Sequence, residues 1–318
     1  MISFVTTLKP LTGRFNVIQL NAIRSWLRVC NECEIVVVGD EEGVEGLVRR
    51  YQLKHVKEVR RAPSGAPYLD DLLRVAEGVA SFETICLINA DIILLRDFLR
   101  AYHMVRGAFD KFVVTSRRFD LPINYEVDFN GENIDEGLRN EARRSYVGRV
   151  SRGTDLFLFK KDTFINVPPL IIGRLIWSRW FILEGLSNGI PVIDATPVIT
   201  AIHQTHDYAH IKDERVEAAS KSGLRGYDAI ARGLEYKWNS RVGSVAAYFS
   251  EADCNYVLTP DGPVKRSDLN YVIRHIIKYP LINQSTRRAA TLFYRELVPS
   301  KRVRALVKKL GFRSGVLY

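Results

Sequence analysis

Two groups of residues in this chain have the types and spacing of metal ligands. The first, Asn89-Ala90-Asp91, lies between apolar runs at 85–88 and 92–95. A carboxylate in an apolar neighbourhood loses solvation, and a divalent cation offsets that cost. Oxygen ligands suit Mg²⁺ or Mn²⁺, which keep open positions for phosphate oxygens. The triplet predicts a metal site for a diphosphate, with a helix N-cap at Asp91 as an equally good interpretation.

The second group is rich in histidine. Residues 201–210 read Ala-Ile-His-Gln-Thr-His-Asp-Tyr-Ala-His and hold three of the six histidines of the chain. Imidazole suits Mn²⁺ or Zn²⁺, and Asp207 supplies an oxygen or orients a ligand ring. A zinc hydrolase would need a further ligand cluster downstream, where His275 is the only histidine. The segment therefore favours a functional site of another kind over its alternative, a polar loop with one buried histidine.

Apolar runs in residues 1–200 describe the elements that must position these groups. Strand patterns alternate with helical patterns, which predicts an α/β fold with a Rossmann-type, mostly parallel sheet flanked by helices. The expected strands are 2–6, 34–38, 55–59, 83–88, 155–159 and 191–194, and the expected helices are 16–27, 42–53, 69–80 and 174–187. Ligands of such sheets lie beyond the carboxyl ends of the strands. The triplet follows one such end, and polar residues at 6–9 and 39–42 follow two others.

Composition and missing motifs exclude several classes of protein. The 318 residues are 47% hydrophobic and 26% charged, as in an ordinary globular protein. No apolar run approaches the roughly 18–20 residues of a membrane helix, and the N-terminus lacks a signal-peptide layout, so we expect a cytoplasmic enzyme. The Rossmann G-x-G-x-x-G, the P-loop and the G-x-S-x-G elbow are all absent. Cys30 and Cys33 form a lone CxxC, which we interpret as structural cysteines in a reducing compartment.

The pattern divides the chain into three parts. Residues 1–210 carry the alternation of strands and helices, residues 211–285 look mainly helical, and residues 286–318 form a basic tail. Within the first part, residues 124–141 hold six acids against Arg139 alone. That composition is typical of a solvated excursion or lid.

The basic tail accounts for most of the net charge of +10. It holds nine bases against Glu296 alone, interleaved with apolar residues at helical spacing: Arg287, Arg288, Arg295, Lys301, Arg302, Arg304, Lys308, Lys309 and Arg313. A basic amphipathic helix is typical of an element that lies on an anionic membrane surface. One alternative is a helix docked on the protein's own core. A nucleic-acid partner is the least favoured, because no RNA- or DNA-binding module is recognisable.

Five motifs in order resemble those of GT-A-fold glycosyltransferases, which belong to the nucleotide-diphospho-sugar transferase superfamily. They lie at 4–10, 21–26, 38–44, 89–94 and 203–210, and include an N-A-D triplet and a late H-Q-x-H-D-Y segment. The likeness covers roughly residues 1–210. It implies transfer of a sugar from a nucleotide-diphosphate sugar to a carbohydrate, lipid-linked or protein acceptor, with Mn²⁺ or Mg²⁺ as cofactor. The missing signal-peptide layout favours a location in the cytoplasm, and the basic tail adds the expectation of a peripheral contact with the inner face of a membrane.

The resemblance assigns roles to individual residues. Thr6, Thr7 and Lys9 would face the nucleotide, Asp40 would bind the base or ribose, and backbone N–H groups around Ser64 would help to hold phosphate. Asn89 and Asp91 occupy the D-x-D position, where Asp91 would hold the metal and His203 or His206 would complete its coordination.

Two positions depart from the family pattern. Asn89 is a neutral ligand in place of an acid, and Trp177-Ser178-Arg179-Trp180 stands where W-D-x-W is expected. Because a serine hydroxyl is too weak a base near neutral pH, Asp155 and then Asp207 become the candidate catalytic bases. Asp155 has a second interpretation as a cap at the start of a strand. The missing aspartate keeps open another hypothesis, a non-catalytic module that binds a sugar nucleotide or a membrane surface. A nucleotidyltransferase is disfavoured, since residues 8–14 lack its Gly-rich loop.

Overall fold

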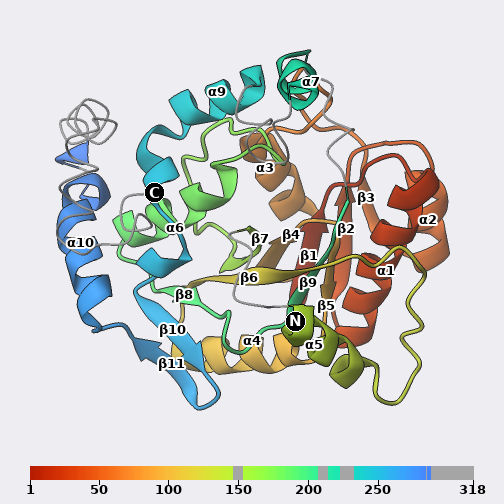
Figure 1. The fold of residues 1–318 in the computed structure, drawn as a ribbon, viewed down its shortest axis with the longest axis horizontal. Helices are drawn as coiled ribbons and strands as arrows, with labels where there is room; N and C mark the ends of the chain where they lie inside the picture. The colour runs from red at the N-terminus through yellow and green to blue at the C-terminus, as the bar shows by residue number, and fades with distance from the viewer. Residues whose placement is uncertain (146–152, 207–213, 223–232, 284, 288–318) are drawn as a thin grey trace.

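A central β-sheet organises the chain, and its inner strands consist almost wholly of buried residues. The computed structural model describes residues 1–145, 153–206, 214–222, 233–283 and 285–287. In this part the strands are β1 (Ile2–Thr6), β2 (Glu34–Val38), β3 (Lys54–Val56), β4 (Thr84–Ile88), β5 (Ile92–Leu94), β6 (Val113–Leu121), β7 (Thr154–Lys160), β8 (Val192–Asp194), β9 (Ala201–Gln204), β10 (Tyr256–Thr259) and β11 (Gly262–Lys265). They follow the order β11-β10-β8-β6-β7-β4-β1-β2-β3, while β9 pairs with β6 and β5 pairs with β9 (Figure 1).

The sheet is mixed and mostly parallel, which confirms the expected fold class. Strands β3, β2, β1 and β4 are parallel neighbours, and β6, β8 and β10 form a second parallel group. Strand β7 lies antiparallel between the two groups. The carboxyl ends of β1, β2 and β4 therefore lie at one edge of the sheet, which brings the polar segments 6–9, 39–42 and 89–91 to the same place.

Helices cover both faces of the sheet, which explains why strands such as β1 and β4 are buried on both sides. The described helices are α1 (Gly13–Val29), α2 (Val44–Tyr51), α3 (Leu69–Val79), α4 (Asp97–Ala108), α5 (Ile134–Ser145), α6 (Trp177–Ser187), α7 (Glu214–Lys221), α9 (Leu234–Val242) and α10 (Leu269–Ile282), with short 3-10 turns η1 (Ser244–Tyr248) and η2 (Glu251–Asp253). Residues of α1, α2 and α4 share one core with Phe4 and Cys86, and residues of α3 and α6 share another with Val5 and Phe157. Trp26 of α1 stacks on Phe4 and donates its indole N–H to the carbonyl of Ile92.

The acidic segment 124–141 is not the solvated excursion that its composition suggests. Val127, Phe129 and Leu138 are buried and form a third, smaller core with Ile93 and Leu95, and α5 begins within this segment. Hydrogen bonds from Arg28 to Asp135 and from Arg139 to Asp97 attach α5 to α1 and α4. The expectation fails because most of the acids lie on the outer side of a segment that also turns Val127, Phe129 and Leu138 inward.

The C-terminal part of the described chain adds to the sheet as well as to the helices. Residues 211–285 include α7, α9 and α10, as the helical pattern predicts, but β10 and β11 also extend the sheet beyond β8. Of the tail, only residues 286–287 lie among the described residues. Within the described chain, no helix combines the length and the apolar character that crossing a membrane requires.

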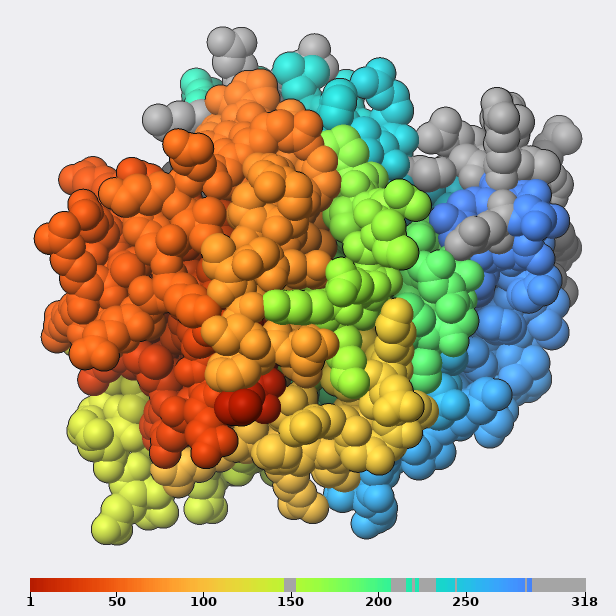
Figure 2. Space-filling view, turned by 180° about the vertical axis from the view of Figure 1, so that it is seen from behind, coloured from red at the N-terminus to blue at the C-terminus, as the bar shows by residue number. Residues whose placement is uncertain are grey.

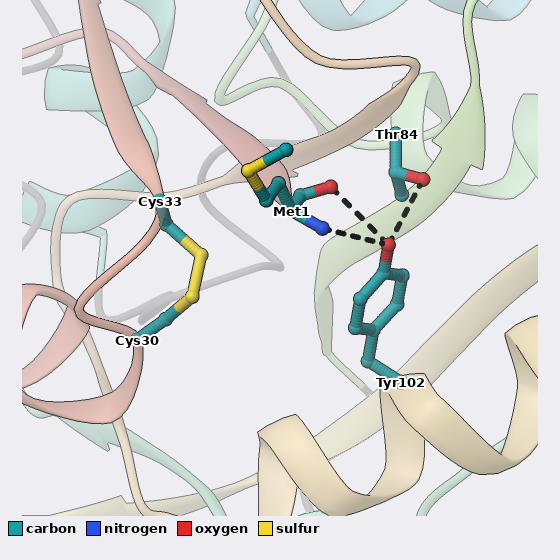
Figure 3. Close-up of a disulfide and its surroundings, with 5 residues drawn as sticks. All are labelled: Met1, Cys30, Cys33, Thr84 and Tyr102. Atoms are coloured by element: carbon teal, nitrogen blue, oxygen red, sulfur yellow. Dashed lines mark hydrogen bonds between the residues drawn. A yellow bond between two sulfur atoms is a disulfide. The ribbon is translucent and has the colours of Figure 1, made fainter.

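The CxxC pair is bonded, which corrects the expectation of reduced cysteines. Cys30 ends α1, Cys33 precedes β2, and a disulfide joins them with their Cα atoms 5.5 Å apart (Figure 3). The tight turn between the two elements brings the cysteines within bridging distance. Nearby, the Tyr102 hydroxyl lies within hydrogen-bond distance of Met1 and Thr84 (Figure 3). Cys86 and Cys254 are buried free thiols, and burial raises the pKa of each.

Candidate active site

A cleft of about 940 Å³ opens at the carboxyl ends of β1, β2 and β4. Nine of the eleven predicted site residues line it: Thr7, Lys9, Asp40, Ser64, Asn89, Asp91, Asp155, His203 and His206. Thr6 is fully buried in β1 beneath the cleft, where its hydroxyl donates to the carbonyl of Thr7. Asp207 lies outside the described residues. The sheet thus brings together residues that are up to 199 positions apart in the sequence.

Asp91, His203 and His206 form a cluster of metal-ligand type, with one candidate ligand atom from each residue within 4.8 Å of the others. The pairing of β5 with β9 sets Ile92 opposite His203, which brings the two motifs side by side. Asp91 Oδ2 lies 3.2 Å from His206 Nε2 and 3.6 Å from His203 Nε2. Oδ1 of the same carboxylate is buried and has no hydrogen-bond partner among the described residues. A buried acceptor without a partner costs free energy that a bound cation would recover, so these residues fit a divalent metal.

The neighbouring cationic groups hold Asp91 in its ionised form. Burial alone would raise the pKa of Asp91, but His203, His206 and the charge of Lys9 hold that pKa well below its usual range. Burial alone would lower the pKa of His203, yet Asp91 and Asp120 raise it to about 9. The Asp91 carboxylate is therefore ionised, and a proton on the His203 imidazole compensates its charge. A metal that bound to this imidazole would displace that proton.

A chain of hydrogen bonds joins the two ends of the Asn89-Ala90-Asp91 triplet through residues outside it. Asn89 Nδ2 donates to Asp155 Oδ1 at 2.8 Å, and the Arg118 guanidinium donates to the other oxygen of Asp155. Arg118 Nε also donates to Asp120 at 3.1 Å, and Asp120 lies 2.8 Å from His203 Nδ1. Because β6 sets Asp120 directly opposite His203 of β9, the backbone register fixes the contact. A carboxylate on Nδ1 orients the ring so that Nε2 faces Asp91.

This chain of hydrogen bonds changes the interpretation of two predicted site residues, Asn89 and Asp155. The amide nitrogen of Asn89 donates a hydrogen bond to Asp155. An ionised aspartate at this position would have no hydrogen to donate, which gives the neutral side chain a structural role. Both oxygens of Asp155 already accept hydrogen bonds. A general base needs an accessible lone pair, so the catalytic role of Asp155 stays a prediction. Both hydrogen bonds are made from its position at the start of β7.

We expect Asn89→Asp to destabilise the fold by about 1–3 kcal/mol, because it removes a donor and sets a second carboxylate against Asp155. Thermal or urea unfolding measures the effect. The double variant Asn89→Asp/Asp155→Asn reverses donor and acceptor and should recover part of the loss. Equal or greater stability of the single variant would contradict the hydrogen bond from Asn89 Nδ2.

Asp120→Asn is expected to weaken Mn²⁺ binding by about 10–100-fold, the usual effect of losing an outer-shell carboxylate. Calorimetric titration of Mn²⁺ into the free protein reads this effect without any substrate. Asp128→Asn, an exposed position in the following loop, serves as the matched control. Unchanged affinity in Asp120→Asn would show that His203 is oriented by other contacts.

The N–H groups of the loop around Ser64 form hydrogen bonds within the chain. The Ser64 N–H and hydroxyl both donate to the carboxylate of Glu235, at 3.2 and 2.9 Å. The N–H of Gly65 donates to the carbonyl of Ala62, and that of Ala66 donates to the Ser64 hydroxyl. Arg174 completes this group with a 2.6 Å bond to Glu235. The three N–H groups thus have partners within the chain, and the role of Ser64 toward a phosphate stays a prediction.

Other residues of the cleft were missed by sequence reasoning. Gln19, buried on α1, bonds both the N–H and the carbonyl of Lys9, at 2.6 and 3.0 Å, and so holds the loop after β1. The Lys9 ammonium lies 4.3 Å from the centre of the Phe15 ring, and Phe15 packs edge-on against His206. A polar residue on the apolar face of a predicted helix was the available signal for Gln19.

Helix α6 presents its first turn to the cleft. Ser178 and Arg179 line the cleft at the position where the resemblance expects W-D-x-W. Ile176, which precedes the helix, has φ of 89°, a value that β-branched residues rarely adopt. Such strain is concentrated at functional sites, and here it adjoins the wall of the cleft.

Comparisons with known proteins show similarity in fold. No protein-family model matches the chain, and no curated protein matches it in sequence. Among solved structures, a mannosyltransferase from Pyrobaculum calidifontis in complex with GDP-Man and Mn²⁺ is 15% identical with a TM-score of 0.42, over 77% of this chain and 73% of its own.

Glucosyl-3-phosphoglycerate synthase from Mycobacterium tuberculosis in complex with Mn²⁺ and UDP-Glc is 11% identical with a TM-score of 0.40, over 71% of this chain and 80% of its own. S. aureus TarS in complex with UDP-GlcNAc is 12% identical with a TM-score of 0.37, over 78% and 71%. These values describe a likeness in the arrangement of helices and strands alone.

Proposed function

We propose that the protein is a glycosyltransferase that moves a sugar from a nucleotide-diphosphate sugar to an acceptor with the help of a divalent metal. The observation that carries the proposal is the cluster of Asp91, His203 and His206 in the cleft beyond the end of β4. An ionised carboxylate with an unsatisfied oxygen beside two imidazoles suits a cation that also holds phosphate oxygens. The cleft has ample room for a nucleotide sugar.

The ligand set points to one of the two expected ions. Mg²⁺ prefers a shell of oxygen ligands, whereas this cluster offers two imidazole nitrogens and one carboxylate. We therefore propose Mn²⁺, held by Asp91, His203 and His206. When bound, such an ion neutralises the charge that grows on the departing nucleoside diphosphate.

The chain's own residues position the sugar donor and assist the departure of its nucleoside diphosphate. The bond between the sugar C1 and the diphosphate oxygen breaks with its electron pair leaving on the nucleoside diphosphate, and the acceptor oxygen bonds to C1. Lys9, whose charge already acts on Asp91, lies where it stabilises that leaving group. Apolar side chains such as Ile172, Ile176 and Trp177 line the cleft and exclude water. The acceptor proton passes to a base, for which Asp155 and Asp207 remain the proposals; Asp155 would first have to release Asn89 or Arg118.

A second candidate is a non-catalytic module that binds a sugar nucleotide. Ser178 favours it, because this residue lies on the cleft wall where the resemblance expects an aspartate and a serine hydroxyl is a poor base. Both candidates would bind a sugar nucleotide, but only the glycosyltransferase would release free nucleotide from it.

A panel of UDP- and GDP-sugars with Mn²⁺ tests both candidates. The glycosyltransferase hypothesis predicts a rise in melting temperature with one donor and release of free nucleotide over time. Stabilisation without release in the presence of varied acceptors would favour the binding module. No stabilisation by any nucleotide would contradict both.

Three further expectations stay proposals. We propose that residues 1–210 form the catalytic unit, that the protein acts in the cytoplasm, and that the basic residues 286–318 contact an anionic membrane surface. The acceptor is a carbohydrate, a lipid-linked molecule or a protein.

A further inference from the structure

Helix α10 exposes apolar side chains on its outward side, although its buried side also holds Tyr271, Leu281 and Ile282. Its buried residues include two cations, Arg274 and Lys278, at 7% and 2% exposure. Its exposed residues are mainly apolar and lie at helical spacing: Leu269 at 74%, Val272 at 38%, Ile276 at 67% and Tyr279 at 53%. A helix on a water-exposed surface normally places its apolar side inward. The outward side of α10 therefore leaves apolar surface exposed to water.

A buried ion-pair network fixes this orientation. Asp253 of η2 accepts hydrogen bonds from Arg274 at 3.0 and 2.9 Å and from Lys278 at 2.8 Å to each oxygen. Lys278 also donates to the carbonyl of Tyr248 at 2.6 Å. Rotating the helix to bury the apolar side would move Arg274 and Lys278 away from the carboxylate of Asp253, which compensates their charge. The outward face is thus a stable property of the fold.

The sequence after this helix is strongly basic. Helix α10 contains no acidic residue, and the sequence that follows it holds nine bases against Glu296 alone. The helix lies at the rim of the molecule (Figure 1), and the same blue segment forms the edge of the molecule viewed from behind (Figure 2). An apolar helix face followed in the sequence by a strongly basic segment is a combination that suits the interface of an anionic bilayer.

We propose that the outward face of α10, formed by Leu269, Val272, Ile276 and Tyr279, docks on an anionic lipid bilayer. This deepens the membrane contact proposed for residues 286–318, because it adds an apolar contact from the folded body to the charges of the tail. A second copy of the chain is a poorer occupant, since pairing two α10 faces would bring together two chains that each carry a net charge of +10.

Vesicle co-sedimentation of the full chain tests the proposal. The wild-type protein should bind vesicles of phosphatidylcholine and phosphatidylglycerol, and bind vesicles of phosphatidylcholine alone much more weakly. The double variant Leu269→Gln/Ile276→Gln, at two exposed positions, should lower partition into the mixed vesicles by about tenfold or more, because it removes apolar area from the contact. Ile165→Gln, at an isoleucine 86% exposed elsewhere on the surface, is the matched control and should bind as the wild type does.

Two results would overturn the proposal. Equal vesicle binding by the double variant and the wild type would assign the contact to charge alone. A lipid-free dimer that becomes a monomer in the double variant, measured by analytical ultracentrifugation, would assign the face to a second copy. Nucleotide release in the absence of vesicles should be the same in the double variant and the wild type, so failure of the membrane contact and failure of the proposed transferase are distinguishable.

Discussion

Replacing Asp91 with asparagine is expected to lower Mn²⁺-dependent nucleotide release by about a thousandfold or more. The substitution keeps the size of the side chain but removes the only carboxylate of the cluster and the charge that faces both histidines. The loss of several kcal/mol of stabilisation of the departing diphosphate corresponds to a factor of this size. Steady-state release of free nucleotide from the best donor of the panel measures it.

The control for this variant is Asp110→Asn, an exposed aspartate between α4 and β6. It should retain wild-type release. Unfolding curves for both variants separate a lost ligand from a lost fold. Full activity in a folded Asp91→Asn protein would contradict the assignment of Asp91 as a metal ligand.

The largest expected effect on stability belongs to Asp253→Asn. Asp253 is 5% exposed and is the carboxylate that compensates two buried cations, Arg274 and Lys278. Removing one partner of a buried ion pair leaves uncompensated charge and costs about 3–5 kcal/mol. Urea unfolding should show this loss, and Asp261→Asn, at an exposed position, should show almost none.

The pH dependence of this difference has a defined sign. Burial alone would raise the pKa of Asp253, but Lys278 and Arg274 lower it below its ordinary value. The carboxylate therefore contributes its full stability above the pKa of an unfolded aspartate and loses it as the pH falls through the lower, folded-state pKa. The stability difference between wild type and Asp253→Asn should shrink with acidification over that range. A difference that stays constant into acid would contradict the ion-pair network.

The sequence predicts the framework of this protein well because its strands are short, apolar and separated by clear turns. The expected strands at 2–6 and 34–38 agree with β1 and β2, and the alternation with helices predicts a mostly parallel sheet. Polar residues after strand ends lie together in the cleft, since parallel strands end at one edge. The approach of Asp91 to the histidines was implied by the resemblance to GT-A-fold glycosyltransferases, and the structure achieves it through the pairing of β5 and β9, which are not among the expected strands.

Contacts that depend on side-chain register were beyond sequence reasoning. The ring from Asn89 through Asp155, Arg118 and Asp120 to His203 requires β6 and β9 to pair in one register, which no local pattern specifies. The partner of Ser64 is Glu235, which is 171 residues away. The composition of α10 shows that it is apolar, but only the position of Asp253 decides which side of the helix turns inward.

A metal held by Asp91 and the two histidines should link the protein to a nucleotide-diphosphate sugar. Calorimetric titration of the best donor into the wild-type protein, with Mn²⁺ and again with EDTA, measures that link directly, and Asp91→Asn repeats it without the ligand. We expect Mn²⁺ to tighten donor binding in the wild type by at least about tenfold and to have no such effect in Asp91→Asn. Donor affinity that is the same with Mn²⁺ and with EDTA, or an Mn²⁺ effect that persists in Asp91→Asn, would contradict it.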